Sequence, residues 1–262
     1  MKKILAVICL SFLSLTFANA EVSMGISGNV GMLSADGKET ITGTSETNVI
    51  WGATSAAART AGTESTSSSK GSEDLAIGYI SGFFEAGVFG TGLRLGLSYV
   101  PYALESETTE NARYDNCSNN ESHLDANSVS DADVNVCPTA PGKNKVSVDL
   151  EDLITMYVAY HHELDMPFVD SFFIKAGLLQ ADVITGESLA SGSQYGNTDL
   201  QGEFLGLGIE KNLDTGMFVR LEGNVTQFDN IKLTNTNSEN TNTIDVTGLD
   251  GATATISIGK TF

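Results

Sequence analysis

The side chains with the clearest chemical potential are charged residues inside short alternating segments of the sequence. Each lies on the face opposite the apolar residues of its segment; the set is Arg94, Lys175, Glu210, Arg220 and Glu222, with Glu85 as a further candidate. Buried charges are retained when they are paired. Because the set is of mixed sign, we expect these residues to pair with one another in an interior, and the alternative is a path for protons or ions.

The three histidines do not form a catalytic set with their neighbours. His161 and His162 stand at a short connection, and His123 lies in a long polar stretch near Asp131 and Asp133. Carboxylates beside one histidine in such a stretch are usually solvated, and no Ser/His/Asp arrangement can be defended. The sequence therefore predicts that the protein is not an enzyme.

Metal and cofactor motifs are also weak. The segment "DADVN" at 131–135 begins like a calcium-binding loop, but Val136 replaces the required glycine and Gly142 the bidentate glutamate. Phosphate-binding glycine loops, dinucleotide fingerprints and Cys-x-x-Cys pairs are absent from the sequence. We predict no cofactor and no metal site, with weak divalent-ion binding by acidic loops as the alternative.

The first twenty residues predict export. Lys2 and Lys3 precede an apolar stretch at 4–17, and "ANA" at 18–20 is a small-x-small cleavage site. This stretch is shorter than the roughly 20 residues that a membrane-spanning helix requires. Cys9 lies inside this stretch and follows Ile8, whereas the cysteine of a lipoprotein signal follows a small residue. We expect a cleaved signal peptide at 1–20, export by the Sec pathway and a mature chain at 21–262.

Two cysteines follow this segment, Cys117 and Cys137. An even number of cysteines outside the reducing cytosol favours a disulfide. The competing interpretation, a zinc site, has only His123 nearby and is a poor set of ligands. We predict a disulfide within the second long polar stretch.

The chain is strongly acidic, with 33 acidic residues, 14 basic residues and a formal net charge of −19. Binding to nucleic acid requires clustered Lys and Arg to neutralise phosphates. The composition therefore excludes a nucleic-acid partner, but acidity alone identifies no function.

Period-2 alternation of apolar and polar residues predicts eight strands. A small hairpin within 34–74 would raise the number to ten, and the same stretch could instead extend the first strand. The phase of the second segment, "LAIGYISGFFEAG", is open because both of its faces are apolar. The eight segments are 22–33, 75–86, 91–101, 146–161, 170–184, 200–210, 216–228 and 243–262.

The connections between these segments alternate between long and short. The long ones are about 34–74, 102–145, 185–199 and 229–242, and the short ones are about 87–90, 162–169 and 211–215. Outer-membrane barrels show this alternation, with long extracellular loops and short periplasmic turns. Closure of the sheet satisfies every backbone group at membrane depth. We predict an all-β, antiparallel up-and-down barrel, and a soluble all-β protein is the alternative.

Aromatic residues gather near both ends of the segments, as expected for girdles at the membrane interfaces. The larger set, toward the periplasmic ends, is Phe83, Phe84, Phe89, Tyr160, Phe168, Phe172 and Phe262. The smaller set, toward the other ends, is Tyr99, Tyr102 and Phe228.

Segments such as "LRLGLSYVPY", "FFIKAGLLQADVITGE" and "ISIGKTF" resemble small outer-membrane barrels of Gram-negative bacteria, of the OmpA-type and OmpX-like superfamily, including uncharacterised barrels of marine proteobacteria. The resemblance implies a last strand ending in Phe262 that the barrel assembly machinery recognises. Lys260 departs from the pattern, because the family often has an aromatic residue there. No catalytic residues carry over.

Together these observations predict a monomeric barrel in outer-membrane lipid. Its acidic loops at about 34–74 and 102–145 would serve a structural or surface-interaction role toward an unidentified extracellular ligand. Because an eight-stranded barrel has an interior just wide enough for side chains, the charged set would plug it. A small porin-like channel is the alternative function.

Overall fold

The computed structural model describes residues 21–44, 64–88, 90–106, 108–113, 142–188, 194–236 and 240–262. The expected signal peptide at 1–20, the pair Cys117 and Cys137, and the segment at 131–135 lie outside the described residues. Among the described residues, no helix is long and apolar enough to cross a membrane.

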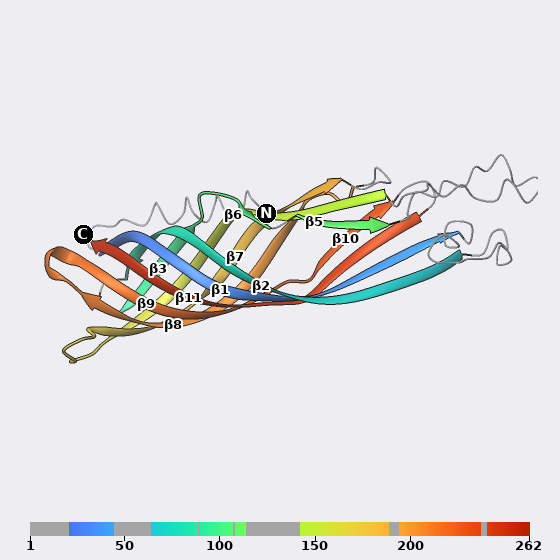
Figure 1. Ribbon diagram of the computed structural model, residues 1–262. Coiled ribbons are helices and arrows are strands. Elements are labelled where there is room, and N and C mark those ends of the chain that lie inside the picture. Colours follow the sequence, from blue (N-terminus) through green and yellow to red (C-terminus); the bar gives the residue numbers. More distant parts are fainter. Residues whose placement is uncertain are drawn as a thin grey trace, which may run out of the picture.

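Eight strands form a closed antiparallel ring (Figure 1). Each pairs with the next in ring order, and β1 pairs with β11 to close the sheet. The prediction of eight rather than ten strands in the barrel is therefore confirmed. The ring consists of β1 (Val22–Thr44), β2 (Glu64–Gly87), β3 (Leu93–Tyr99), β6 (Gly142–Glu163), β7 (Ser171–Ser188), β8 (Thr198–Asn212), β9 (Met217–Phe228) and β11 (Asn240–Thr261).

Three shorter strands attach to this ring without belonging to it. β4 (Leu104–Glu105) and β5 (Thr109–Arg113) both pair with β6, while β10 (Ile231–Thr236) pairs with β11. β4 and β5 run on from β3, and β10 runs on from β9. They therefore lengthen the wall of the barrel beyond the ring.

The alternation of side chains follows the predicted faces. On β1, Ile26 is 59% exposed on the outside, whereas Ser27 is buried on the inside. The phase of β2, which the sequence left open, places Phe83 and Glu85 inside and Phe84 outside. Phe83 therefore belongs to the interior and not to an aromatic girdle.

The strands are longer than their apolar patterns. The stretch 34–74 was expected to be a loop, but the β1–β2 ladder continues without a register shift to the pair Thr44 and Glu64. The expected loop at 102–145 likewise contains β4, β5 and the start of β6. The long stretch at 229–242 contains β10 and the start of β11. These extensions are rich in Ser, Thr, Gly and charged residues, so they carry no apolar face, although Thr fits a strand well.

The two ends of the barrel differ. The connections 88–92, 164–170 and 213–216 are short and lie at the end that also holds residues 21 and 262, which we call the turn end. The lengthened strands point to the opposite end, which we call the loop end (right in Figure 1). The short turns and the long connections thus gather at opposite ends, as predicted.

Candidate functional site: a charged layer inside the barrel

Arg220 on β9 lies at the centre of the interior. Its Nη1 and Nη2 atoms donate hydrogen bonds to the two carboxylate oxygens of Glu85 on β2, each at 2.7 Å, and its Nε donates to Glu210 on β8 at 2.5 Å. All three side chains are buried. A guanidinium donates to a carboxylate in this two-pronged way with strong geometric preference. The contact with Glu85 joins two strands that β11 and β1 separate in the ring.

Two further cations complete the layer. Arg94 Nη1 lies 3.7 Å from Glu85 and 3.6 Å from Glu210, so its contacts are ion pairs rather than hydrogen bonds. Lys175 Nζ donates to both oxygens of Glu222, at 2.9 and 2.7 Å. Each carboxylate therefore has a cation beside it.

Aromatic rings surround the cations. The guanidinium of Arg220 lies 4.4 Å from the ring centroid of Phe218, and the rings of Phe83 and Phe173 lie 5.5 and 5.6 Å away. Lys175 Nζ lies 4.2 Å from the ring centroid of Tyr157. Such contacts stabilise cations that have lost water. They also fill the barrel around the charges.

The layer, defined by the six charged residues above, is electrically balanced, with three cations and three carboxylates. Five of them were predicted from the sequence as interior charges, and the structure brings all five together. Glu85 was only a further candidate, yet it binds Arg220 most directly. Tyr157, whose hydroxyl donates to Glu85 at 2.8 Å, was not identified from the sequence. A tyrosine on the polar face of a predicted membrane strand was the available signal.

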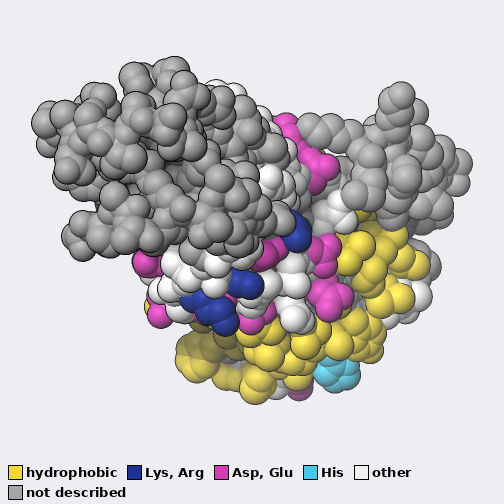
Figure 2. Space-filling model, turned by 90° about the vertical axis from the view of Figure 1, so that its right-hand side faces the viewer, with side chains coloured by type: hydrophobic (Ala, Val, Ile, Leu, Met, Phe, Trp, Pro, Cys, Tyr) yellow, Lys and Arg dark blue, Asp and Glu magenta, His cyan; other side chains and the backbone are white. Residues whose placement is uncertain are grey.

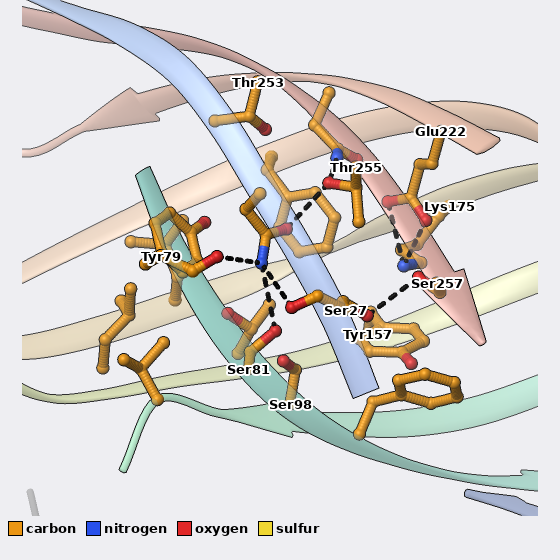
Figure 3. A pocket seen from close by; sticks show the side chains of 18 of the residues that line it. Ser27, Tyr79, Ser81, Ser98, Tyr157, Lys175, Glu222, Thr253, Thr255 and Ser257 are labelled. Atoms are coloured by element: carbon orange, nitrogen blue, oxygen red, sulfur yellow. Dashed lines mark hydrogen bonds and ion pairs between the residues drawn. The ribbon is translucent and has the colours of Figure 1, made fainter. Parts of the chain in front are cut away.

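A polar chamber of about 80 Å³ lies between this layer and the loop end. Figure 3 shows serine and threonine side chains around it, from the consecutive strands β11, β1, β2 and β3. Asn29 donates to Ser81 at 3.2 Å and accepts from Thr255 at 2.8 Å, and Ser27 and Ser257 share a hydrogen bond of 2.8 Å. A polar cavity of this size holds several waters, since one water needs about 10–15 Å³ by this measure.

A larger recess of about 1020 Å³ lies on the other side of the layer, at the turn end. Arg94, His161 and Glu210 contribute to its wall. His161 was placed near the interior charges by the sequence, and its ring stacks on that of Phe173 with centroids 4.9 Å apart. The charged layer therefore separates a small chamber from an open recess.

The remaining predicted residue, Phe262, lies at the turn end and is 66% exposed. Its backbone N–H donates to the carbonyl of Val22 at 2.8 Å. Lys260 Nζ lies 5.2 Å from the centroid of its ring. Within the described parts of the chain, no group of three or more His, Cys, Asp or Glu residues could hold a metal ion.

Comparison with known proteins gives no family assignment, since no family model and no curated protein matches the chain. Among solved structures, it is similar to Ail, the attachment invasion locus protein of Yersinia pestis, solved with the heparin analogue sucrose octasulfate. The two are 9% identical, with coverage of 90% of this chain and 99% of Ail and a TM-score of 0.34.

Neisserial surface protein A is 12% identical, with coverage of 88% of this chain and 97% of that one and a TM-score of 0.33. The translocator domain of the autotransporter NalP from Neisseria meningitidis is 9% identical, with coverage of 100% and 95% and a TM-score of 0.32. The description of the chain as a closed eight-stranded barrel rests on its own strand pairing.

Proposed function

We propose that this protein is an integral outer-membrane barrel whose interior is closed by the charged layer and whose loop end serves interactions at the cell surface. The observation that carries the proposal is the inversion of the usual arrangement of side chains. Large apolar residues cover the outside, while the charged residues and many polar residues lie inside, among a few aromatic rings. A protein in water buries its large apolar residues, whereas a barrel in lipid exposes them.

The exposed apolar residues support the membrane assignment. Ile26, Leu207 and Ile256, on three different strands, are 59%, 60% and 61% exposed. Viewed from the loop end, hydrophobic side chains gather on the flank of the barrel, and charged side chains lie closer to that end (Figure 2). Exposed aromatic residues lie near both ends of this apolar surface. Phe168 and Phe172 are near the turn end, and Tyr102 is nearer the loop end.

The lengthened strands support a role at the surface. Beyond Ser34 the exposed residues of β1 are polar, and the neighbouring parts of β2 and β11 change in the same way. Polar strand ends of this kind suit water above a membrane, where they can present the long connections to a partner. Export through the predicted signal peptide and recognition of Phe262 by the barrel assembly machinery complete the proposal.

A porin-like channel is the second candidate, and one observation favours it. The chamber and the recess both approach the charged layer, so a single layer of side chains separates two polar spaces. Movement of one charged side chain could connect them. Against this, every carboxylate of the layer already has a cation beside it. Of the six charged residues in the layer, all except Arg94 make hydrogen bonds with other members of the layer.

The conductance of the refolded protein in a planar lipid bilayer separates the two candidates. A closed layer predicts an electrically silent wild type. Stable, discrete openings of the wild type would overturn the closed interior and favour the channel. The same preparation, incubated with lipid A or with peptides, is expected to give no product.

The membrane assignment itself has a simple test. The detergent-folded protein should partition into lipid vesicles, give a β-sheet circular dichroism spectrum and migrate differently on gels before and after boiling. A protein that stayed in the aqueous phase with a helical spectrum would contradict the assignment.

A further inference from the structure

The recess at the turn end contains polar groups that make no hydrogen bonds with the charged layer. Three of these groups come from neighbouring strands: Arg94 from β3, His161 from β6 and Ser171 from β7. The backbone N–H of His161 donates to the carbonyl of Gly92 at 2.8 Å, which fixes β6 beside the β2–β3 turn. Ser171 pairs with Glu163 of β6 on one side and with Glu210 of β8 on the other. The three side chains thus line one part of the wall.

These groups lack hydrogen-bond partners among the residues that the structure describes. His161 is 8% exposed and both of its ring nitrogens are unpartnered, and the hydroxyl of Ser171, which is 6% exposed, is also unpartnered. Arg94 Nη1 has only the two longer ion pairs and no hydrogen bond. Buried polar groups are nearly always satisfied, by protein, water or ligand. Something in the recess should therefore bind them.

The combination of groups indicates what that ligand carries. A guanidinium only donates, a serine hydroxyl can donate, and a neutral histidine has one ring N–H that donates. A carboxylate is the planar acceptor that a guanidinium matches best. Glu210 also lines this wall, but Arg220 Nε already donates to its carboxylate. The three unpartnered groups beside it therefore suit the carboxylate group of a ligand.

The rim of the recess limits what else the ligand can carry. Glu21 and Glu163 are exposed there, so a second negative charge on the ligand would be repelled. Asp170 also lines the recess, but Lys211 and the backbone N–H of Asn212 already bind its carboxylate, at 2.8 and 2.6 Å. A neutral or positive group on the outer part of the ligand would be tolerated or attracted.

We propose that this recess binds a small zwitterionic molecule, with its carboxylate on Arg94, His161 and Ser171 and its cationic group toward the acidic rim. The proposal goes beyond the surface role of the loop end, because it concerns the opposite end of the barrel. Binding in the recess does not depend on whether the loop end binds a partner.

The test uses the refolded full-length barrel with its histidines isotopically labelled, followed by nuclear magnetic resonance. Glycine is the probe at neutral pH, acetate supplies the carboxylate alone, and methylammonium supplies the cation alone. We expect saturable shifts of the His161 ring signals, with glycine binding more tightly than acetate and methylammonium having no effect.

Variants assign the binding groups. Arg94→Gln should weaken glycine binding by roughly tenfold or more, because a hydrogen bond to a charged group is lost. Ser171→Ala should weaken it less and keeps the test valid if the Arg94 variant fails to fold. Ser81→Ala is the matched control, since Ser81 is a buried serine on the other side of the charged layer. It should bind glycine as the wild type does.

Three results would overturn the proposal. An absence of saturable shifts at His161 would mean that the recess holds water only. Equal responses to glycine and methylammonium would mean that the cationic group, and not the carboxylate, is bound. Unchanged glycine affinity in both Arg94→Gln and Ser171→Ala would place the binding elsewhere.

Discussion

Arg220 and Glu85 meet across the interior of the barrel through two hydrogen bonds of 2.7 Å, although 135 positions separate them in the sequence. Their strands, β9 and β2, are not neighbours in the ring. The contact therefore ties two non-adjacent parts of the wall together and does not depend on strand pairing. It is the structural centre of the charged layer.

Loss of either partner should destabilise the barrel strongly. Arg220→Ala leaves Glu85 and Glu210 buried without their main cation, and breaking a buried ion pair typically costs about 3–5 kcal/mol. Urea unfolding in lipid vesicles, followed by circular dichroism and by gel mobility, measures the change. Lys232→Ala is the control, because this lysine is exposed and lies 3.8 Å from Asp245. An Arg220→Ala barrel as stable as the control would contradict the role of the pair.

A double variant tests whether the two residues act as a unit. Glu85→Gln and Arg220→Met should each destabilise the barrel, but their combination should cost less than the sum of the single changes. Directly interacting residues typically show coupling of about 0.5–3 kcal/mol. The measurement is a double-mutant cycle from urea unfolding. Additive effects within error would mean that the contact contributes little in the membrane.

The layer also predicts the electrical behaviour of variants. Removing the Arg220 side chain opens space between the chamber and the recess, so Arg220→Ala should raise the conductance of a silent wild type in a planar bilayer. Lys232→Ala, on a strand outside the ring, should remain silent. If Arg220→Ala refolds and is as silent as the wild type, the layer is not the barrier.

The sequence predicted the strand faces well because lipid and interior make opposite demands on alternate residues. Ile26 and Ser27 could be assigned on that ground alone. For the stretch beyond Ser34 the sequence left a loop, a hairpin and an extension of the first strand open, because both faces are polar there and the alternation disappears. Such strand ends are held by main-chain pairing with β2 and β11, which leaves little trace in side-chain type.

The sequence predicted which charged residues lie inside the barrel, but not which of them pair with one another. Each residue could be assigned to the inside from its own strand, but no local pattern says which strands face each other across the ring. Glu85 was the weakest assignment because Phe83 and Phe84 made both faces of its segment apolar. Closure of the sheet decides its phase and places it opposite Arg220.

The contact between Lys260 and Phe262 makes a prediction about assembly. The lysine ammonium lies 5.2 Å from the centroid of the exposed ring. Lys260 occupies the position where the barrels that this sequence resembles often have an aromatic residue. If the assembly machinery reads this surface, Lys260→Phe should increase the folded fraction in the outer membrane and Phe262→Ala should decrease it. Gel mobility without boiling measures that fraction. Lys38→Phe, on the far part of β1, is the control for added hydrophobicity and should leave it unchanged.

The turn end should show a defined pH dependence through Asp170. The hydrogen bond from Lys211 is the main cause that lowers the pKa of this carboxyl below its usual value. The second cause is the hydrogen bond from the backbone N–H of Asn212. A lowered pKa in the folded state means that the folded protein binds the proton less readily than the unfolded chain. The contribution of Asp170 to stability is therefore fully present above the ordinary aspartate pKa. It is lost as the pH falls through the lower, folded-state pKa.

Asp170→Asn isolates this contribution. The variant should be less stable than the wild type at neutral pH, and the difference should shrink as the solution is acidified below the ordinary aspartate pKa and vanish at the lowest pH. Urea unfolding across the acid range measures it. The effect should be modest because the carboxyl is exposed to solvent, which screens the ion pair. A stability difference that grew with acidification would contradict the assignment of Lys211 and Asn212 as the groups that hold Asp170.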